Sequence, residues 1–147
     1  MDPVAALIVL AAIVLVGTTV GVVIRRRDGH VRHRAHEREH ATATALGRDA
    51  SEFGSDATLV QFSTEFCTRC PQTRRVLGGI AQQREGVTHV DVDLTHRPDL
   101  AKQFHVLQTP TTLLVDAAGT VRARIAGAPR PDEVIRELDT ILETAHV

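Results

Sequence analysis

The feature that most constrains this chain is an uncharged apolar stretch that runs from Val4 to Ile24. As an α-helix, with a rise of about 1.5 Å per residue, such a stretch spans about 30 Å, the thickness of the hydrocarbon core of a bilayer. A core helix that is apolar on every side needs a large protein to enclose it, and this chain has 147 residues. The sequence therefore predicts a transmembrane helix within residues 1–24.

The flanks of this stretch predict its orientation. No Lys or Arg precedes it, and Arg25, Arg26 and Arg27 follow it directly. A cleavable signal peptide has its basic residues first and ends in a small-residue cleavage site. Because basic residues mark the cytoplasmic flank, we expect a single-pass membrane protein whose remaining chain lies in the cytoplasm. The alternative is an extracytoplasmic domain.

Gly17 and Gly21 have the spacing of a helix-dimer motif. Small residues at such spacing are common in membrane helices, so we predict no dimer from them. The oligomeric state stays open.

Residues 25–44 are predicted to form a charged juxtamembrane linker that is rich in Arg and His. Its arginines are suited to anionic lipid headgroups. An alternative is metal or pH chemistry, because on a helix the linker histidines would line one side. These are His30, His33, His36 and His40.

The rest of the chain alternates between strand and helix patterns. We expect helices at about 46–53, 71–85, 97–105 and 130–145, and strands at 57–63, 87–93, 111–116 and 120–126. Strands joined through a helix run parallel, whereas the turn at Gly119 makes the last two strands an antiparallel hairpin. The order predicts an α/β domain with a mixed sheet covered by helices on both faces.

Composition excludes two classes of protein. Seventeen basic and eighteen acidic side chains give a net charge of -1, and aromatic residues make up only 3% of the chain. Neither the electrostatics nor the stacking surface that nucleic-acid binding needs is present. Two cysteines cannot build a multi-bridge disulfide scaffold.

These two cysteines, Cys67 and Cys70, stand where the first strand of the domain gives way to its helix. A thiolate near a helix N-terminus is stabilised by the helix dipole, and Arg69 adds a nearby positive charge. Cys67 is therefore a candidate nucleophile toward a disulfide. The spacing brings Cys70 close enough to resolve the mixed disulfide that results.

Two other interpretations of the cysteine pair stay open. Zinc sites usually take four ligands, and the sequence has no second cysteine pair. His89, His96 and His105 are scattered along the chain, which makes a metal half-site a weaker hypothesis and predicts no metal. Plain packing of two small core residues is the other alternative.

From about residue 45 to 147 the chain resembles the thioredoxin family. The resemblance is carried by the segments LVQFSTEFCTRC, VDVDL, LQTPTTLLVDAAGTV and IAGAPRPDEV. It implies a thioredoxin-like α/β fold over residues 45–147, preceded by the single membrane helix. It also implies thiol-disulfide exchange with no separate cofactor, since the Cys67–Cys70 disulfide is itself the redox group.

The resemblance further assigns a substrate groove. Pro110 is expected to be cis and to face the cysteines, and the backbone of Thr109 to pair with an extended substrate segment. Phe66 and Gly127 belong to the same groove, where a side chain at Gly127 would obstruct a partner. The partners it implies are protein disulfides and an electron donor such as a thioredoxin reductase-type system.

The chain also departs from the family pattern. Phe66, Thr68 and Arg69 replace the usual tryptophan, glycine and proline around the two cysteines. Gln61 replaces the buried aspartate that handles the proton of the second thiol, and glutamine is no general base. His89 near the usual lysine, Glu65 or water are alternatives for that role. Arg69 and Gln61 are therefore expected to tune the reduction potential.

The sequence thus predicts a membrane-anchored thiol-disulfide oxidoreductase. It most simply reduces protein disulfides near the membrane, because the cytosol is reducing. A redox-inert thioredoxin-like binding module is the alternative function. Metal handling by the linker histidines ranks behind both.

Overall fold

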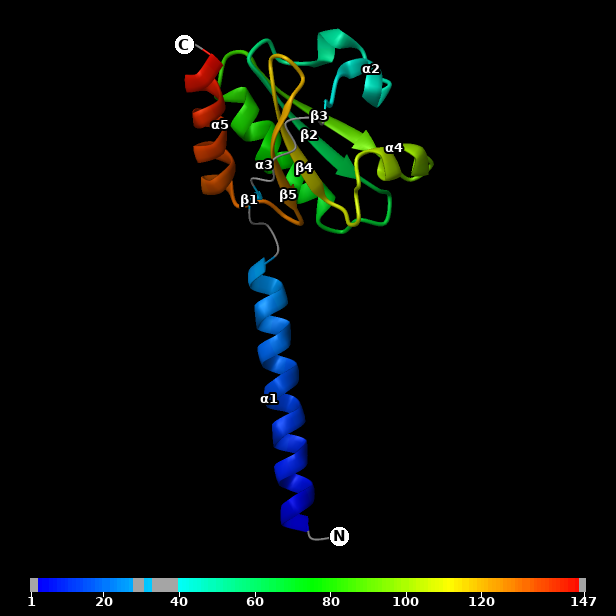
Figure 1. Cartoon of the computed structure of the whole chain (residues 1–147), viewed down its shortest axis with the longest axis vertical. Coiled ribbons are helices and arrows are strands. Elements are labelled where there is room, and N and C mark those ends of the chain that lie inside the picture. Colours follow the sequence, from blue (N-terminus) through cyan, green and yellow to red (C-terminus); the bar gives the residue numbers. More distant parts are fainter. Residues whose placement is uncertain (1–2, 28–30, 33–39, 146–147) are drawn as a thin grey trace.

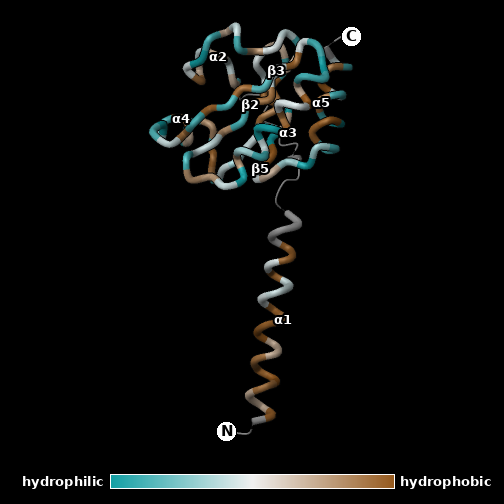
Figure 2. The backbone as a smooth tube through the Cα atoms, turned by 180° about the vertical axis from the view of Figure 1, so that it is seen from behind, coloured by the Kyte–Doolittle hydropathy of each residue, from teal (hydrophilic) through white to brown (hydrophobic). Residues whose placement is uncertain are grey.

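The computed structural model describes residues 3–27, 31–32 and 40–145. Helix α1 (Pro3–Arg27) projects from a folded domain, and most of its length is coloured as hydrophobic (Figures 1 and 2). Its segment Val4–Val23 is the one helix of the described residues that is long and apolar enough to cross a membrane, and none of it is buried. Length and composition alone also suit a signal sequence near an N-terminus.

The domain is built on a mixed sheet, as predicted. The strands are β1 (Val31–Arg32), β2 (Ala57–Ser63), β3 (Val87–Asp93), β4 (Thr111–Asp116) and β5 (Val121–Ala126). Their order in the sheet is β1-β5-β4-β2-β3. β2 and β3 are parallel because a helix connects them, whereas β4 is antiparallel to both β2 and β5.

Helices cover both faces of this sheet, which confirms the predicted layers. The helices of the domain are α2 (Ala43–Leu46), the 3-10 turn η1 (Ala50–Glu52), α3 (Cys70–Gln82), α4 (Pro98–Gln103) and α5 (Pro131–Ala145). α3 and α5 pack on one face through Leu77 and Leu138. The other face holds Leu46, Leu100 and Phe104.

β2 is buried on both faces and lies in the middle of these layers. Leu59 belongs to the core beneath α3 and α5, whereas Val60 and Phe62 belong to the opposite core. The ring of Phe62 lies 5.4 Å from that of Phe104. A central strand that is anchored on both sides holds its C-terminal end, where the cysteines follow, in a rigid frame.

The first helix of the domain differs from the prediction. Helix α2 begins after Thr42, whose side chain accepts a hydrogen bond from the Ala45 amide, and ends at Gly47, which has a φ of 65°. A left-handed glycine terminates a helix. Asp49 then caps the separate turn η1, so the expected helix at 46–53 is two short pieces.

Part of the segment expected to be a linker belongs to the sheet. β1 pairs antiparallel with β5, and His40 forms an isolated bridge with Thr120. Ala41 is buried, and its amide donates to the carbonyl of Gly119 at 2.8 Å. The expected helical alignment of His30, His33 and His36 lies outside the described residues.

Candidate active site

The two cysteines differ in exposure because of where α3 begins. After β2 a turn is closed by hydrogen bonds from the Cys67 amide to the Thr64 carbonyl, 3.1 Å, and from the Cys70 amide to the Cys67 carbonyl, 3.2 Å. α3 starts at Cys70, with Pro71 in its first turn, so Cys67 lies in the turn before the helix. Cys67 is partly exposed and Cys70 is buried.

Cys67 and Cys70 form a disulfide, with their Cα atoms 5.4 Å apart. Because the sulfur of Cys67 is the more accessible of the two, it is the one that a partner can reach. Cys70 is placed to react only with its neighbour.

A second segment faces this pair from the start of β4. The Thr109–Pro110 peptide is cis, as the resemblance implies, and Pro110 is buried. Its carbonyl accepts a hydrogen bond from the Gly127 amide at 2.8 Å. The hydroxyl groups of Thr64 and Thr109 are 3.1 Å apart and join the segment to the cysteine turn.

Between these segments runs a groove of about 320 Å³. The structure brings together in it the predicted residues Phe66, Cys67, Arg69, Thr109, Pro110 and Gly127. Thr64, Thr68 and Gln108 also line it. Nothing in the spacing of Thr64 and Gln108 marks them in the sequence as groove residues.

Gln61, the expected tuning residue, lies behind the cysteines and outside the groove lining. It is fully buried, and its Nε2 donates to the backbone oxygen of Cys70 at 3.1 Å. Its Oε1 lies 3.2 Å from Nε2 of His89. Because an amide oxygen only accepts, this arrangement requires the hydrogen of His89 to be on Nε2.

His89 is thus connected to Cys70 through Gln61. Burial lowers the pKa of His89 from 6.5, the nearby carboxylate of Asp91 opposes this, and Arg74 adds to the lowering. Arg74 and Asp91 form an ion pair, and Oδ1 of Asp91 is buried without a hydrogen-bond partner. The neutral imidazole is therefore the favoured form of His89 near pH 7.

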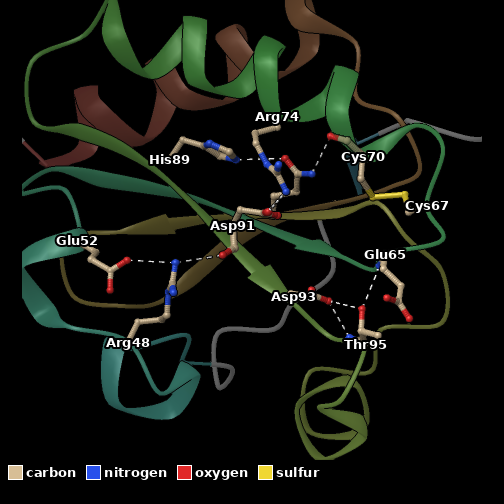
Figure 3. A network of polar contacts seen from close by, with 11 residues as sticks. Arg48, Glu52, Glu65, Cys67, Cys70, Arg74, His89, Asp91, Asp93 and Thr95 are labelled. Atoms are coloured by element: carbon tan, nitrogen blue, oxygen red, sulfur yellow. Dashed lines mark hydrogen bonds and ion pairs between the residues drawn. A yellow bond between two sulfur atoms is a disulfide. The ribbon is translucent and has the colours of Figure 1, made fainter.

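Glu65 is another candidate proton acceptor, and its backbone is fixed by a hydrogen bond. Its amide donates to Oγ1 of Thr95 at 3.0 Å, and the Thr95 hydroxyl donates to Asp93 at 2.5 Å (Figure 3). The hydrogen bond from the Thr95 hydroxyl lowers the pKa of Asp93, followed by that from the Thr95 amide. This network orients the cysteine turn, while the Glu65 side chain is exposed.

The mixed sheet, the cysteine pair at the start of α3 and the facing cis-proline segment define a dithiol-disulfide protein of the thioredoxin class. A family model described as Thioredoxin matches residues 45–140. The chain therefore belongs to the thioredoxin family, and it is a thiol-disulfide oxidoreductase.

Known thioredoxins match over most of the domain. The chain is 32% identical to a thioredoxin of Mycobacterium tuberculosis over 108 residues, which is 69% of this chain and 91% of that protein. It is 33% identical to a thioredoxin of Mycolicibacterium smegmatis over 91 residues, 60% of this chain and 80% of that one.

A longer relative is a bifunctional thioredoxin reductase/thioredoxin of Mycobacterium leprae, 30% identical over 110 residues. The match covers 71% of this chain but only 24% of that protein. Among solved structures, a mutant thioredoxin from Halobacterium salinarum shares the fold, with a TM-score of 0.54 and 20% identity. That likeness covers 60% of this chain and 76% of the other.

Proposed function

We propose that this chain is a membrane-anchored reductase that acts on disulfide bonds of protein clients near the cytoplasmic face of the membrane. The observation that supports the exchange chemistry is the unequal exposure of the two cysteines. Cys67 lines the groove beside Thr109 and Pro110, and Cys70 is buried behind it. The membrane anchoring and the cytoplasmic orientation belong to this proposal.

The reaction begins when the thiolate of Cys67 attacks one sulfur of the client disulfide. A mixed disulfide forms, and the other client sulfur leaves as a thiolate that takes up a proton. The start of α3 and the positive charge of Arg69 favour the Cys67 thiolate. These same groups raise the tendency of the pair to be reduced.

Cys70 then attacks the sulfur of Cys67 and releases the second client thiol. Two electrons have passed from the dithiol to the client, and the Cys67–Cys70 disulfide has formed. No separate cofactor enters this sequence. A thioredoxin reductase-type donor would return the pair to the dithiol, as thioredoxin family proteins act with such systems.

The groove residues around Cys67 bind the client segment and do not take part in the bond changes. An extended client segment would pair with the backbone of Thr109 and lie against Pro110. Gly127 also lines the groove, and its φ of 89° lies in the region that favours glycine. A side chain there would narrow the groove and strain the backbone.

The test is a redox titration of the full chain in nanodiscs against glutathione buffers, with mass-tagging of free thiols. We expect a single two-electron transition. A potential near about -270 mV would suit a reductase, and one near about -120 mV would make the protein an oxidant. If Cys67 and Cys70 never form an intramolecular disulfide, the redox-inert binding module replaces this proposal.

Matched serine variants separate the roles of the two sulfurs. Cys70→Ser should accumulate a mixed disulfide with a disulfide-containing protein, because nothing resolves it. Cys67→Ser should accumulate none, since the attacking sulfur is gone. Equal trapping by both variants would contradict the assigned roles.

A further inference from the structure

The membrane helix is attached to the domain by a very short connection. α1 ends at Arg27, and β1 begins at Val31. Because a residue step spans at most about 3.6 Å, the four steps from Arg27 to Val31 cover no more than about 14 Å. The place where β1 joins the sheet therefore decides which part of the domain lies next to the membrane.

β1 joins the sheet at the groove end. Val31 lies opposite Ile125, near the end of β5, and Gly127 follows two residues later in the groove lining. The far end of the same edge is marked by the bridge between His40 and Thr120. At about 3.4 Å per residue, Thr120 lies about 17 Å along the strand from Ile125.

The position of α1 relative to the domain in Figure 1 agrees with this register. In Figure 1, α1 approaches the domain at the end where β5 finishes and where α3 begins. The β4–β5 turn lies at the opposite end. The groove and the tether thus share one end of the domain.

Exposed apolar side chains gather at that same end. Among the described residues outside α1, the large hydrophobic side chains that stand exposed are Phe66, at 85%, and Leu107, at 96%. Phe66 lines the groove, and Leu107 directly precedes Gln108, which also lines it. Aromatic and apolar side chains are stabilised at a membrane interface or against an apolar partner segment.

We propose that the groove faces the bilayer and takes its disulfide from an integral membrane protein, in an extended segment directly outside that partner's own membrane span. This rests on the proposed anchoring and reductase function. The partner segment would enter between the domain and the lipid headgroups, with its apolar residues against Phe66 and Leu107. The exchange is the one described above, from the Cys67–Cys70 dithiol to the partner disulfide.

The orientation is tested by energy transfer to acceptor-labelled lipid headgroups in nanodiscs. In the full chain with Cys67→Ser and Cys70→Ser, a donor is attached at Leu107→Cys or, as the matched position at the far end, at Ala118→Cys. Both residues are exposed. We expect stronger transfer from position 107. Equal transfer, or stronger transfer from position 118, overturns the proposal.

A longer tether gives the control. A flexible Gly/Ser insertion of about 20 residues after Arg27 has an end-to-end distance of about 25 Å, enough to let the domain turn. The difference between positions 107 and 118 should then disappear. If it persists unchanged, the short connection is not what orients the groove, and the proposal fails.

The partner class is tested with two single-span substrates that carry the same disulfide loop, about 5 or about 40 residues from the membrane. Co-reconstituted with the full chain, the near disulfide should be reduced at least 10-fold faster, and the Gly/Ser insertion should remove this preference. Equal rates overturn this inference but leave the reductase function standing. If neither disulfide is reduced, the proposed reductase function is wrong. If the full chain is not found in the membrane fraction, the anchoring is wrong, and this inference fails with it.

Discussion

Gln61 and His89 show how a few side chains set the surroundings of the buried cysteine. The glutamine amide is neutral at every pH, and both of its ends are hydrogen-bonded, to Cys70 and to His89. Unlike a buried carboxylate, it places no charge behind Cys70. The proton of the Cys70 thiol must therefore leave by another route. The hydrogen bonds from His89 through Gln61 end at the backbone oxygen of Cys70 and not at its sulfur.

Removing the amide should reveal its structural contribution. In Gln61→Leu, the Cys70 carbonyl and the His89 ring lose their buried partner, so we expect a loss of about 1–3 kcal/mol in the free energy of unfolding. Urea unfolding of the full chain in detergent micelles, followed by circular dichroism, measures it. The exposed Gln72→Leu in α3 is the control, and an equal effect of both variants would contradict the role of Gln61.

His89 predicts a pH dependence of stability. Its folded-state pKa lies below 6.5, so the unfolded chain takes up its proton first as the pH falls. The free energy of unfolding should then be fully retained above pH 6.5 and decline as the pH falls from there toward the folded-state pKa. Urea titrations between about pH 8 and 5 test this around the ordinary histidine value.

The matched variants are His89→Gln and His96→Gln, the latter on the exposed surface. His89→Gln should flatten the pH profile, whereas His96→Gln should keep it. A profile that is unchanged in His89→Gln would show that another group is responsible.

At the scale of elements, α3 begins with Cys70 and also contains two adjacent glycines, Gly78 and Gly79, in its interior. Gly79 has open space around the position of a Cβ atom, whereas Gly54, between η1 and β2, does not. A Cβ at Gly54 would overlap the backbone oxygens of Ala57 and Gly86. Gly79 thus lowers the stability of its helix, whereas Gly54 is required because two backbone segments approach closely there.

Alanine substitution should therefore act in opposite directions at these positions. Gly79→Ala is expected to stabilise the domain by about 0.5–1 kcal/mol, because alanine loses less backbone entropy in a helix. Gly54→Ala should destabilise it, because the backbone must shift. Urea midpoints in detergent micelles measure both, and a loss of stability in Gly79→Ala would contradict the open space.

At the scale of the whole molecule, α1 and the domain form two parts with different surroundings. Every described apolar side chain from Val4 to Val23 is exposed, whereas most apolar residues of the domain pack in two cores. Exposure of so much apolar surface in water is unfavourable, by about 25 cal/mol per Å². An exposed apolar helix of this kind suits lipid, where a helix satisfies its backbone hydrogen bonds internally.

The cytoplasmic orientation predicts a labelling pattern in intact cells. After reduction, an impermeant thiol reagent should label Cys67 only when the membrane is permeabilised. Asp2→Cys, in a chain with Cys67→Ser and Cys70→Ser, should be labelled without permeabilisation, since the opposite end of α1 lies outside. Labelling of Cys67 in intact cells would show an extracytoplasmic domain.

By itself, the sequence determined the layers and most elements of the domain. The strands at 87–93 and 111–116 have the predicted bounds because apolar residues, period-two alternation and turn residues all act locally. The Cys67–Cys70 pair was predicted from its spacing and from its place between a strand and a helix. The cis-proline segment and Gly127 were assigned through family resemblance, which depends on short motifs. α2 was misplaced because the left-handed conformation of Gly47 ends the helix early.

Only the tertiary structure decided which distant groups meet. β1 has two residues and pairs through backbone groups, so no side-chain pattern predicts it. The link from His89 through Gln61 to Cys70 depends on the parallel register of β2 and β3, in which Gln61 lies opposite Asp91. Local residue patterns specify local backbone conformation, whereas register and sheet-edge pairing arise from packing of the whole domain, and these join β1 to the groove end of β5.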